Sequence, residues 1–243
     1  MKLKICHLYP DILNLYGDRG NVMCMQKRLM WRNIEAEITQ VPYGDNSSLS
    51  DFDIFFIGGG QDFELGLLIS DLKTGKGDNI KAAVNDGKSF LCICGGYQIM
   101  GRSYELRDGT KYDYLGALAV HTVSGKSRNI GNTITDTKDY GAIVGFENHI
   151  GMTYLDEGVV PLGKIRLGFG NNGEDGTEGA IYKNVICTYQ HGPVLPKNPV
   201  LCDAILETAL KRKYGRADLA PLDDTFENEA HDSVIKALMD RQK

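Results

Sequence analysis

A cysteine followed by two glycines is the part of this sequence best suited to chemistry. Cys94 ends the apolar run 89–93, and Gly95 and Gly96 open a segment of helical character. A buried strand that turns sharply into a helix at small residues is the layout of a nucleophile elbow. The first turn of such a helix offers unpaired N–H groups and a positive dipole end, which favour a thiolate and later an oxyanion. Cys94 is therefore the candidate nucleophile. The alternative is an inert buried thiol, the ordinary state of a cysteine in a folded protein.

A cysteine nucleophile needs a base and an oxyanion site, and two other segments could supply them. Of the five histidines, His191 stands directly after the probable strand 185–190 and before a Gly-Pro step. A second apolar run, 53–57, ends in three glycines, of which Gly59 and Gly60 could present a backbone N–H to an oxyanion. Active sites of open parallel sheets lie at the carboxyl ends of the strands, where all three segments fall. The alternatives are a loop histidine that caps a carbonyl and a plain flexible glycine turn.

The elements that must position these segments alternate as in an α/β protein. Apolar runs predict strands, and apolar residues at helical spacing predict helices. The strands are expected at 3–9, 36–41, 53–57 and 89–93, and the helices at 18–32, 63–72, 80–85 and 198–214. This alternation favours a central, mostly parallel sheet with helices on both faces. Short β-like runs then predict additional antiparallel strands at 117–123, 132–136, 142–146, 179–182 and 185–189. Residues 1–215 would form the domain, and 216–243 a C-terminal extension of linker and short helix (228–241).

Composition excludes several classes of protein. The 243 residues are 42% hydrophobic and 24% charged, as in one globular domain. The net charge of −5 argues against a nucleic-acid partner, and no apolar run approaches the roughly 20 residues that span a bilayer. The start of the chain does not read as a signal peptide, and six scattered cysteines predict reduced thiols in a cytoplasm. No second cysteine pair or histidine cluster accompanies Cys92 and Cys94, so no metal site is predicted.

Three nucleotide-binding patterns in the sequence are incomplete. Residues 168–173 match G-x-G-x-x-G, but the acidic, glycine-rich stretch that follows cannot open a helix beneath a pyrophosphate. Gly-Lys-Ser at 87–89 and at 125–127 matches the end of a phosphate-binding loop. Alanine and valine, however, stand at 82 and 120, where the first glycine is required. No ATP site is therefore predicted in this chain.

Together, the glycine turn, the cysteine elbow and the histidine segment resemble the active-site segments of class I glutamine amidotransferases. The similarity is to the branch related to the glutaminase domain of cobyric acid synthase, with its Tyr-x-His-Gly segment at 189–192 and its E-x-H-x-G segment at 147–151. It implies the flavodoxin-like fold of that family. The roles it implies are nucleophile Cys94, base His191, and oxyanion donors Gly59, Gly60 and Gly95. It also suggests that Arg128 contacts the glutamine, since a guanidinium suits a carboxylate; the alternative is a surface arginine in a loop.

The stretch 8–21 and the length of the chain are most similar to the glutaminase subunits of lipid II isoglutaminyl synthases. That resemblance implies hydrolysis of L-glutamine to glutamate and ammonia through a Cys-His thioester mechanism. A Mur-ligase-like synthetase subunit of the MurT type would complete a heterodimer and, with ATP and Mg, amidate the D-glutamate α-carboxyl of the lipid II stem peptide to D-isoglutamine. This is a step of peptidoglycan and cell-wall biogenesis. No cofactor is expected on this chain, which would be cytoplasmic and reach the inner membrane face through lipid II.

The sequence departs from the conventional class I pattern in the acidic residue expected near the catalytic histidine. The branch lacks the glutamate that conventionally follows the histidine by two residues, and Pro193 stands there in this chain. A catalytic histidine needs an acceptor that fixes its tautomer. The resemblance implies that a carboxylate of the partner supplies it, so we expect the isolated chain to be a poor glutaminase. Three alternatives stay open: a glutaminase for another acceptor such as a corrinoid carboxylate, a Cys-elbow hydrolase without ammonia transfer, and a non-enzymatic regulatory module.

Overall fold

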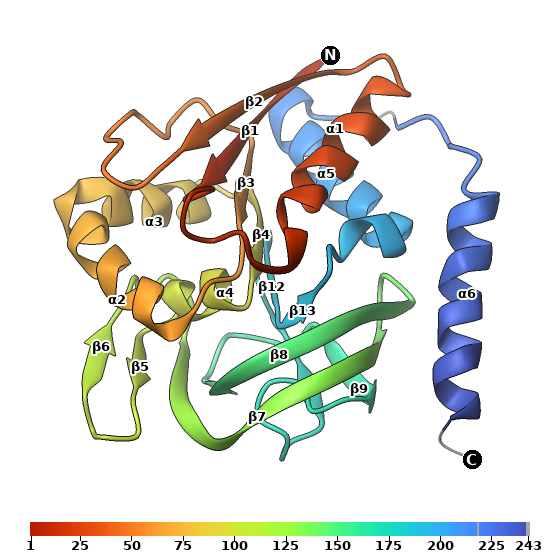
Figure 1. Cartoon of the computed structure of the whole chain (residues 1–243). Coiled ribbons are helices and arrows are strands. Elements are labelled where there is room, and N and C mark those ends of the chain that lie inside the picture. The colour runs from red at the N-terminus through yellow and green to blue at the C-terminus, as the bar shows by residue number, and fades with distance from the viewer. Residues whose placement is uncertain (218, 242–243) are drawn as a thin grey trace.

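A six-stranded sheet forms the centre of the molecule, and five of its strands are parallel (Figure 1). The computed structural model describes residues 1–217 and 219–241, with the backbone alone for 62–65. In spatial order the strands are β11 (Ala180–Tyr182), β12 (Val185–Thr188), β4 (Ser89–Ile93), β3 (Ile54–Ile57), β1 (Lys2–Leu8) and β2 (Glu35–Val41). β3, β4 and β12 are buried along their whole length, as continuous apolar runs in a covered parallel sheet should be. The predicted mostly parallel sheet is confirmed, but 185–189, expected among the antiparallel strands, forms β12 of this sheet and runs parallel to β4.

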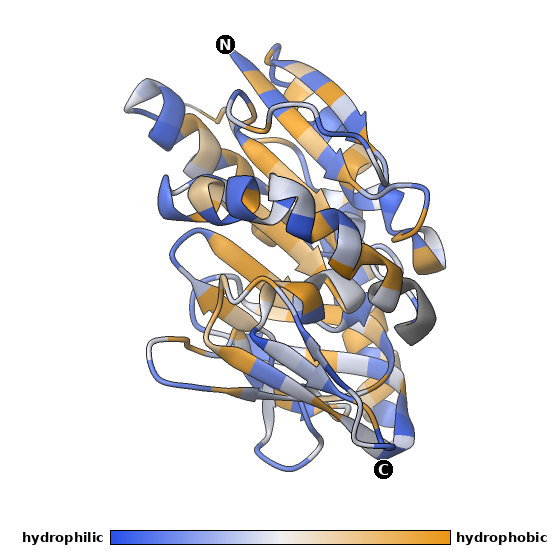
Figure 2. Ribbon diagram, turned by 90° about the vertical axis from the view of Figure 1, so that its left-hand side faces the viewer, coloured by the Kyte–Doolittle hydropathy of each residue, from blue (hydrophilic) through white to orange (hydrophobic). Residues whose placement is uncertain are grey.

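Helices cover both faces of this sheet. α1 (Arg19–Met30) and α5 (Pro199–Tyr214) lie on one side and α3 (Gly77–Asn85) on the other (Figure 1). Figure 2 shows hydrophobic residues gathered on the central strands between these layers. The remaining short elements before the second sheet are η1 (Leu15–Gly17), α2 (Asp62–Asp71), η2 (Leu72–Lys76) and α4 (Gly95–Met100). η3 (Leu195–Lys197) leads into α5.

A second, largely antiparallel sheet lies at one end of the first (Figure 1). Its members are β5 (Ser103–Glu105), β6 (Lys111–Asp113), β7 (Val120–Thr137), β8 (Ala142–Leu155), β9 (Gly163–Leu167), β10 (Thr177–Glu178) and β13 (Gln190–His191). The predicted strands 117–123 and 132–136 fall largely within the single strand β7, and 142–146 is only the beginning of β8. The pairing of β7 with β8 shifts its register between Ser124 and Asn129. Such a shift is a β-bulge, which lets one strand continue through residues 124–131, where the sequence predicted no strand.

β13 connects the two sheets. The chain leaves the parallel sheet at the end of β12, where Thr188 lies beside Ile93 of β4. It then pairs with β8 of the antiparallel sheet, where His191 lies opposite Phe146. The carboxyl end of the parallel sheet, where Cys94 follows β4, is therefore next to a strand that belongs to the other sheet.

The C-terminal helix α6 (Thr225–Asp240) lies on the outside of the domain (Figure 1) and has no buried residue, and its His231 ring Nδ1 lies 2.9 Å from the Lys197 carbonyl oxygen. Gly215, with φ 72°, follows the last residue of α5, so this helix ends where the predicted helix 198–214 ends. The stretch after it is tied to the body, because Arg28 pairs with Asp224 at 2.7 Å and Arg32 donates to the Ala220 carbonyl at 2.6 Å. Among the helices of the described ranges, none is both long and apolar enough to cross a bilayer.

Candidate active site

Cys94 occupies a strained elbow between β4 and α4. Its backbone has φ 47° and ψ −101°, a positive φ that is uncommon for a residue other than glycine. Its N–H donates to the Thr188 carbonyl at 2.8 Å, which fixes the elbow to β12. A Cβ atom on Gly96 would lie 2.5 Å from the Ile57 carbonyl oxygen, so only glycine allows α4 to approach β3 this closely. Strain held in this way is typical of a functional site, and the predicted elbow is confirmed as a structure.

The glycine turn after β3 packs directly against the histidine. A Cβ atom on Gly59 would lie 2.4 Å from His191 Cε1. The N–H of Gly59 donates to Asp18 Oδ2 at 2.8 Å. The Gly59 N–H already has the Asp18 carboxylate as its acceptor. The expectation that Gly59 donates to an oxyanion is therefore corrected. Gly60 lines the cavity in front of Cys94, and Gly95 is the first residue of α4, whose first N–H groups have no acceptor within the helix. These two remain the proposed donors.

Asp18, immediately before α1, provides a carboxylate for His191. Its Oδ2 atom lies 3.2 Å from His191 Nδ1, and both side chains are fully buried. His191 therefore has an acidic neighbour within this chain, in addition to the partner carboxylate that the resemblance implies. This carboxylate can hold the imidazole in one tautomer and orientation, and the contribution of a partner carboxylate stays a prediction. Asp18 lies within the stretch 8–21 that carried the closer resemblance, but nothing local in that stretch marked it as an acid for the histidine.

The surroundings of His191 favour a charged imidazole. Burial lowers the pKa of His191, but the negative charges of Cys94 and Asp18 outweigh burial and raise that pKa to about 10. A proton taken from the thiol would therefore stay on the imidazole as part of an ion pair. Because Nδ1 faces Asp18, proton exchange with Cys94 falls to Nε2. Nε2 is buried and makes no hydrogen bond to any residue within the described ranges.

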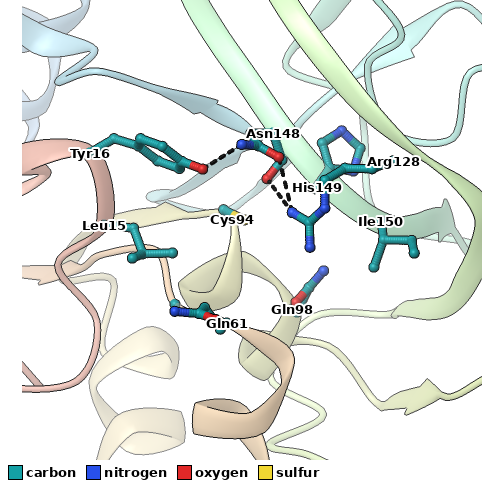
Figure 3. A pocket seen from close by; sticks show the side chains of 10 residues that line it. Leu15, Tyr16, Gln61, Cys94, Gln98, Arg128, Asn148, His149 and Ile150 are labelled. Carbon is teal, nitrogen blue, oxygen red and sulfur yellow. Dashed lines mark hydrogen bonds between the residues drawn. The ribbon is translucent and has the colours of Figure 1, made fainter.

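Cys94 borders a cavity of about 300 Å³ (Figure 3). Its lining comes from η1, the glycine turn, the elbow, β7 and β8: Leu15, Tyr16, Gly60, Gln61, Cys94, Gln98, Arg128, Asn148, His149 and Ile150. This volume is at the lower end of the range for small-molecule sites. Arg128 is thus placed beside the nucleophile, where the sequence analysis expected a substrate contact.

Tyr16 covers the histidine and was not anticipated from the sequence. Its ring meets the His191 ring edge to face, with centroids 4.9 Å apart. Its backbone is in the left-handed region, at φ 54° and ψ 23°. The Asn148 side chain donates to its hydroxyl, as Figure 3 shows. A bulky residue is rarely held in this conformation unless its surroundings require it, so Tyr16 is a fixed part of the site.

A layer of buried polar groups supports the site from behind. Gln98 donates to the Tyr189 hydroxyl at 3.1 Å, and the His149 ring stacks on the Tyr189 ring with centroids 3.7 Å apart. Glu178 accepts the Thr188 hydroxyl at 2.9 Å and the Tyr189 N–H at 2.7 Å. These contacts fix the end of β12 just before His191. Gln98, on α4, therefore ties the helix that follows Cys94 to the end of β12.

Within the part of the chain that the structure describes, no group of three or more His, Cys, Asp or Glu side chains could hold a metal ion. The six cysteines are all free thiols. The G-x-G-x-x-G match at 168–173 leads into β10 and not into a helix. It therefore lacks the helix N-terminus that binds a pyrophosphate.

Comparison with known proteins places these features in a family context. Residues 4–199 match the profile of the CobB/CobQ-like glutamine amidotransferase domain. The GatD subunit of the lipid II isoglutaminyl synthase (glutamine-hydrolyzing) of Staphylococcus aureus strain N315 is 41% identical over 240 residues, which cover 99% of this chain and 96% of that protein. The GatD subunit of Streptococcus pneumoniae is 37% identical over 217 residues, with coverages of 88% and 83%.

Solved structures agree on the fold. A glutamine amidotransferase from Thermotoga maritima superposes with a TM-score of 0.56 at 17% sequence identity, over 98% of this chain and 94% of that one. The PurLQS structure from the same organism gives a TM-score of 0.54 at 14% identity. At such identities the likeness concerns the fold alone.

Proposed function

Since the chain belongs to the family of CobB/CobQ-like glutamine amidotransferase domains, we propose that it is the glutamine-hydrolysing subunit of a lipid II isoglutaminyl synthase. The observation that carries this proposal is a single cavity that holds a strained cysteine and an arginine, with a buried histidine and aspartate behind them. The two GatD subunits that match over most of the chain support the choice of enzyme.

The site residues divide the hydrolysis of glutamine between them. Cys94 attacks the carboxamide carbon as a thiolate, after its proton has passed to Nε2 of His191. The N–H groups of Gly60 and Gly95 stabilise the oxyanion of the tetrahedral intermediate. His191 then gives its proton to the departing ammonia, and water releases glutamate from the thioester. Arg128 binds the α-carboxylate of glutamine, which places the carboxamide at Cys94.

The ammonia would be used on a second subunit. Amidation of a carboxyl group requires its activation, and we assign that step, with ATP and Mg, to a Mur-ligase-like partner of the MurT type. The partner would amidate the D-glutamate α-carboxyl of lipid II to D-isoglutamine. We propose that the heterodimer works in the cytoplasm, at the membrane face where lipid II is anchored. The GatD relatives are named as subunits of such a synthase, and this supports the assignment.

A substitution of the nucleophile tests the division of labour. In the complex with the synthetase subunit, we expect Cys94→Ser to abolish glutamine-dependent amidation while amidation from added ammonium salt continues. Product formation from each nitrogen source is the measurement. Cys24→Ser, which changes a thiol on α1 away from the cavity, is the matched control and should retain both activities. Glutamine hydrolysis by the Cys94→Ser variant at the wild-type rate would show that the nucleophile is misassigned.

The isolated chain gives a second test. Because Asp18 supplies an acceptor for His191 within this chain, we expect it to hydrolyse glutamine without its partner, contrary to the expectation from the sequence. Ammonia release by the chain alone and by the heterodimer should be compared at equal active-site concentration. Release only from the heterodimer would restore the view that the partner completes the site.

A further inference from the structure

Asn148 joins the two sides of the catalytic cavity. Its Oδ1 atom accepts a hydrogen bond from Arg128 Nη1 at 3.0 Å, and its backbone carbonyl accepts from the same atom at 3.3 Å. Its Nδ2 atom donates to the Tyr16 hydroxyl. All three side chains line the cavity beside Cys94, as Figure 3 shows.

The direction of the Asn148 amide is set by these two neighbours. A guanidinium has only donors, so the amide oxygen must face Arg128. The amide nitrogen must then face Tyr16, whose oxygen can accept. The Asn148 Oδ1 atom therefore faces the side of the cavity where Arg128 lies.

The cavity also has to bind a cation. Free glutamine carries an α-ammonium as well as an α-carboxylate, and Arg128 serves the carboxylate in the proposed function. Among the lining side chains that the structure describes, none is a carboxylate. Neutral oxygens must then meet the ammonium. Because both charged groups of the substrate are attached to one carbon atom, their binding partners must be neighbours, as Arg128 and the Asn148 oxygen are.

We propose that Asn148 is a substrate-binding residue that accepts a hydrogen bond from the α-ammonium of glutamine. This inference rests on the proposed function. Before substrate arrives, the amide oxygen occupies Arg128. The substrate carboxylate, a charged and bidentate acceptor, displaces it. The released oxygen then accepts from the ammonium, while Tyr16 keeps the amide in place. Asn148 thereby selects an amino acid over a simple amide of the same length.

The experiment compares L-glutamine with 4-carbamoylbutanoate, which has the same amide and carboxylate but no amino group. We expect the wild-type chain to prefer glutamine in kcat/KM by roughly 10- to 100-fold, the range for a hydrogen bond to a charged group. Asn148→Ala should reduce this preference to within about 3-fold, mainly by raising KM for glutamine. Tyr16→Phe, which keeps the ring on His191 but removes the hydroxyl, should give an intermediate preference.

Asn132→Ala is the matched control, since Asn132 is an exposed asparagine on β7 outside the cavity. It should keep the wild-type preference. Two outcomes overturn the inference: a wild-type chain that does not discriminate between the two amides, or an Asn148→Ala variant that loses activity equally on both. The second outcome would mean that Asn148 only braces Arg128. If neither the wild-type chain nor its heterodimer hydrolyses glutamine, the proposed function itself fails, and the two failures are thus distinct.

Discussion

Asp18 contacts two parts of the site at once. It accepts hydrogen from the His191 ring and from the Gly59 N–H, so one carboxylate positions both the base and the glycine turn on which the base rests. A histidine without such an acceptor has two tautomers and a freely turning ring. Asp18 is thus placed to orient the His191 ring, a role that the resemblance would give to another subunit.

Asp18→Asn should therefore act mainly on the catalytic rate. An amide keeps the shape of the carboxylate but removes its charge, and the analogous loss in a Ser-His-Asp triad is about 10⁴-fold. We expect kcat to fall by roughly 10²- to 10⁴-fold with KM nearly unchanged. Asp11→Asn, on an exposed aspartate of the same N-terminal loop, is the control and should leave kcat within about 2-fold.

The pH profile of Asp18→Asn gives an independent readout. The Cys94 and Asp18 charges, acting against burial, raise the pKa of His191 to about 10, so the imidazolium should be lost only on the alkaline side. Without the Asp18 charge, that pKa must fall, and the alkaline limb of kcat/KM should move to lower pH. If the alkaline limb stays at the same pH and kcat/KM is lower by the same factor at every pH, Asp18 has only a structural role.

Glu178 fixes the end of β12 by hydrogen bonds. It lies on β10, is fully buried, and its Oε1 atom accepts from Thr188 and Tyr189 at the end of β12. Its Oε2 atom makes no hydrogen bond within the described part of the chain. Burial raises the pKa of Glu178 to about 8, so the folded chain holds a neutral acid here at neutral pH.

The stability of the fold should therefore depend on pH through Glu178. In the unfolded chain this group ionises near 4.5, whereas in the folded chain it keeps its proton up to about 8. The folded state binds the extra proton between these values, so stability falls as pH rises from about 4.5 through about 8. Glu178→Gln lacks this dependence. The free energy of unfolding of Glu178→Gln, relative to that of the wild type, should increase by on the order of 1–3 kcal/mol between pH 5 and pH 9, which corresponds to several degrees in Tm. Glu157→Gln, on an exposed glutamate, should show no such trend.

Helices and strands could be predicted from the sequence where the residues that stabilise them are close together in the chain. The runs before Cys94 and after Asp53 are buried strands because they are apolar throughout, and both end in glycines that the structure needs for close approach. The long strands β7 and β8 were expected as fragments, because glycine and asparagine interrupt their alternation, and it is pairing with each other and with neighbouring strands that maintains them. Asp18 could not have been assigned from local pattern, since 173 positions separate it from His191 and only the fold joins them.

At the scale of the whole molecule, the C-terminal extension has two parts with different roles. α6 has no buried residue, whereas Asp224 just before it pairs with Arg28, whose side chain is 3% exposed. Arg28 also pairs with Asp203 at 2.6 Å, so the loss of Asp224 would remove one of the two carboxylates that face this buried guanidinium.

Two truncations should therefore differ. A chain that ends at Asp224 should keep its Tm within a few degrees and its glutaminase rate within about 2-fold. A chain that ends at Gly215 should lose roughly 1–3 kcal/mol in its free energy of unfolding, because Arg32 loses the Ala220 carbonyl and Arg28 loses Asp224, although both keep Asp203. Thermal unfolding and ammonia release measure both. Equal stability of the two truncated chains would show that the stretch 216–224 is a passive linker and that the domain ends at residue 215.

The joining of β13 to both sheets also bears on biosynthesis. The proposed acid, nucleophile and base of the site stand at positions 18, 94 and 191, and the base lies on a strand that pairs with β8 of the β7–β8 hairpin. A nascent or prematurely terminated chain that stops before residue 191 thus carries the thiol without the group that activates it. We expect such a fragment to release no ammonia from glutamine, because the proposed base is added only after most of the antiparallel sheet has been translated.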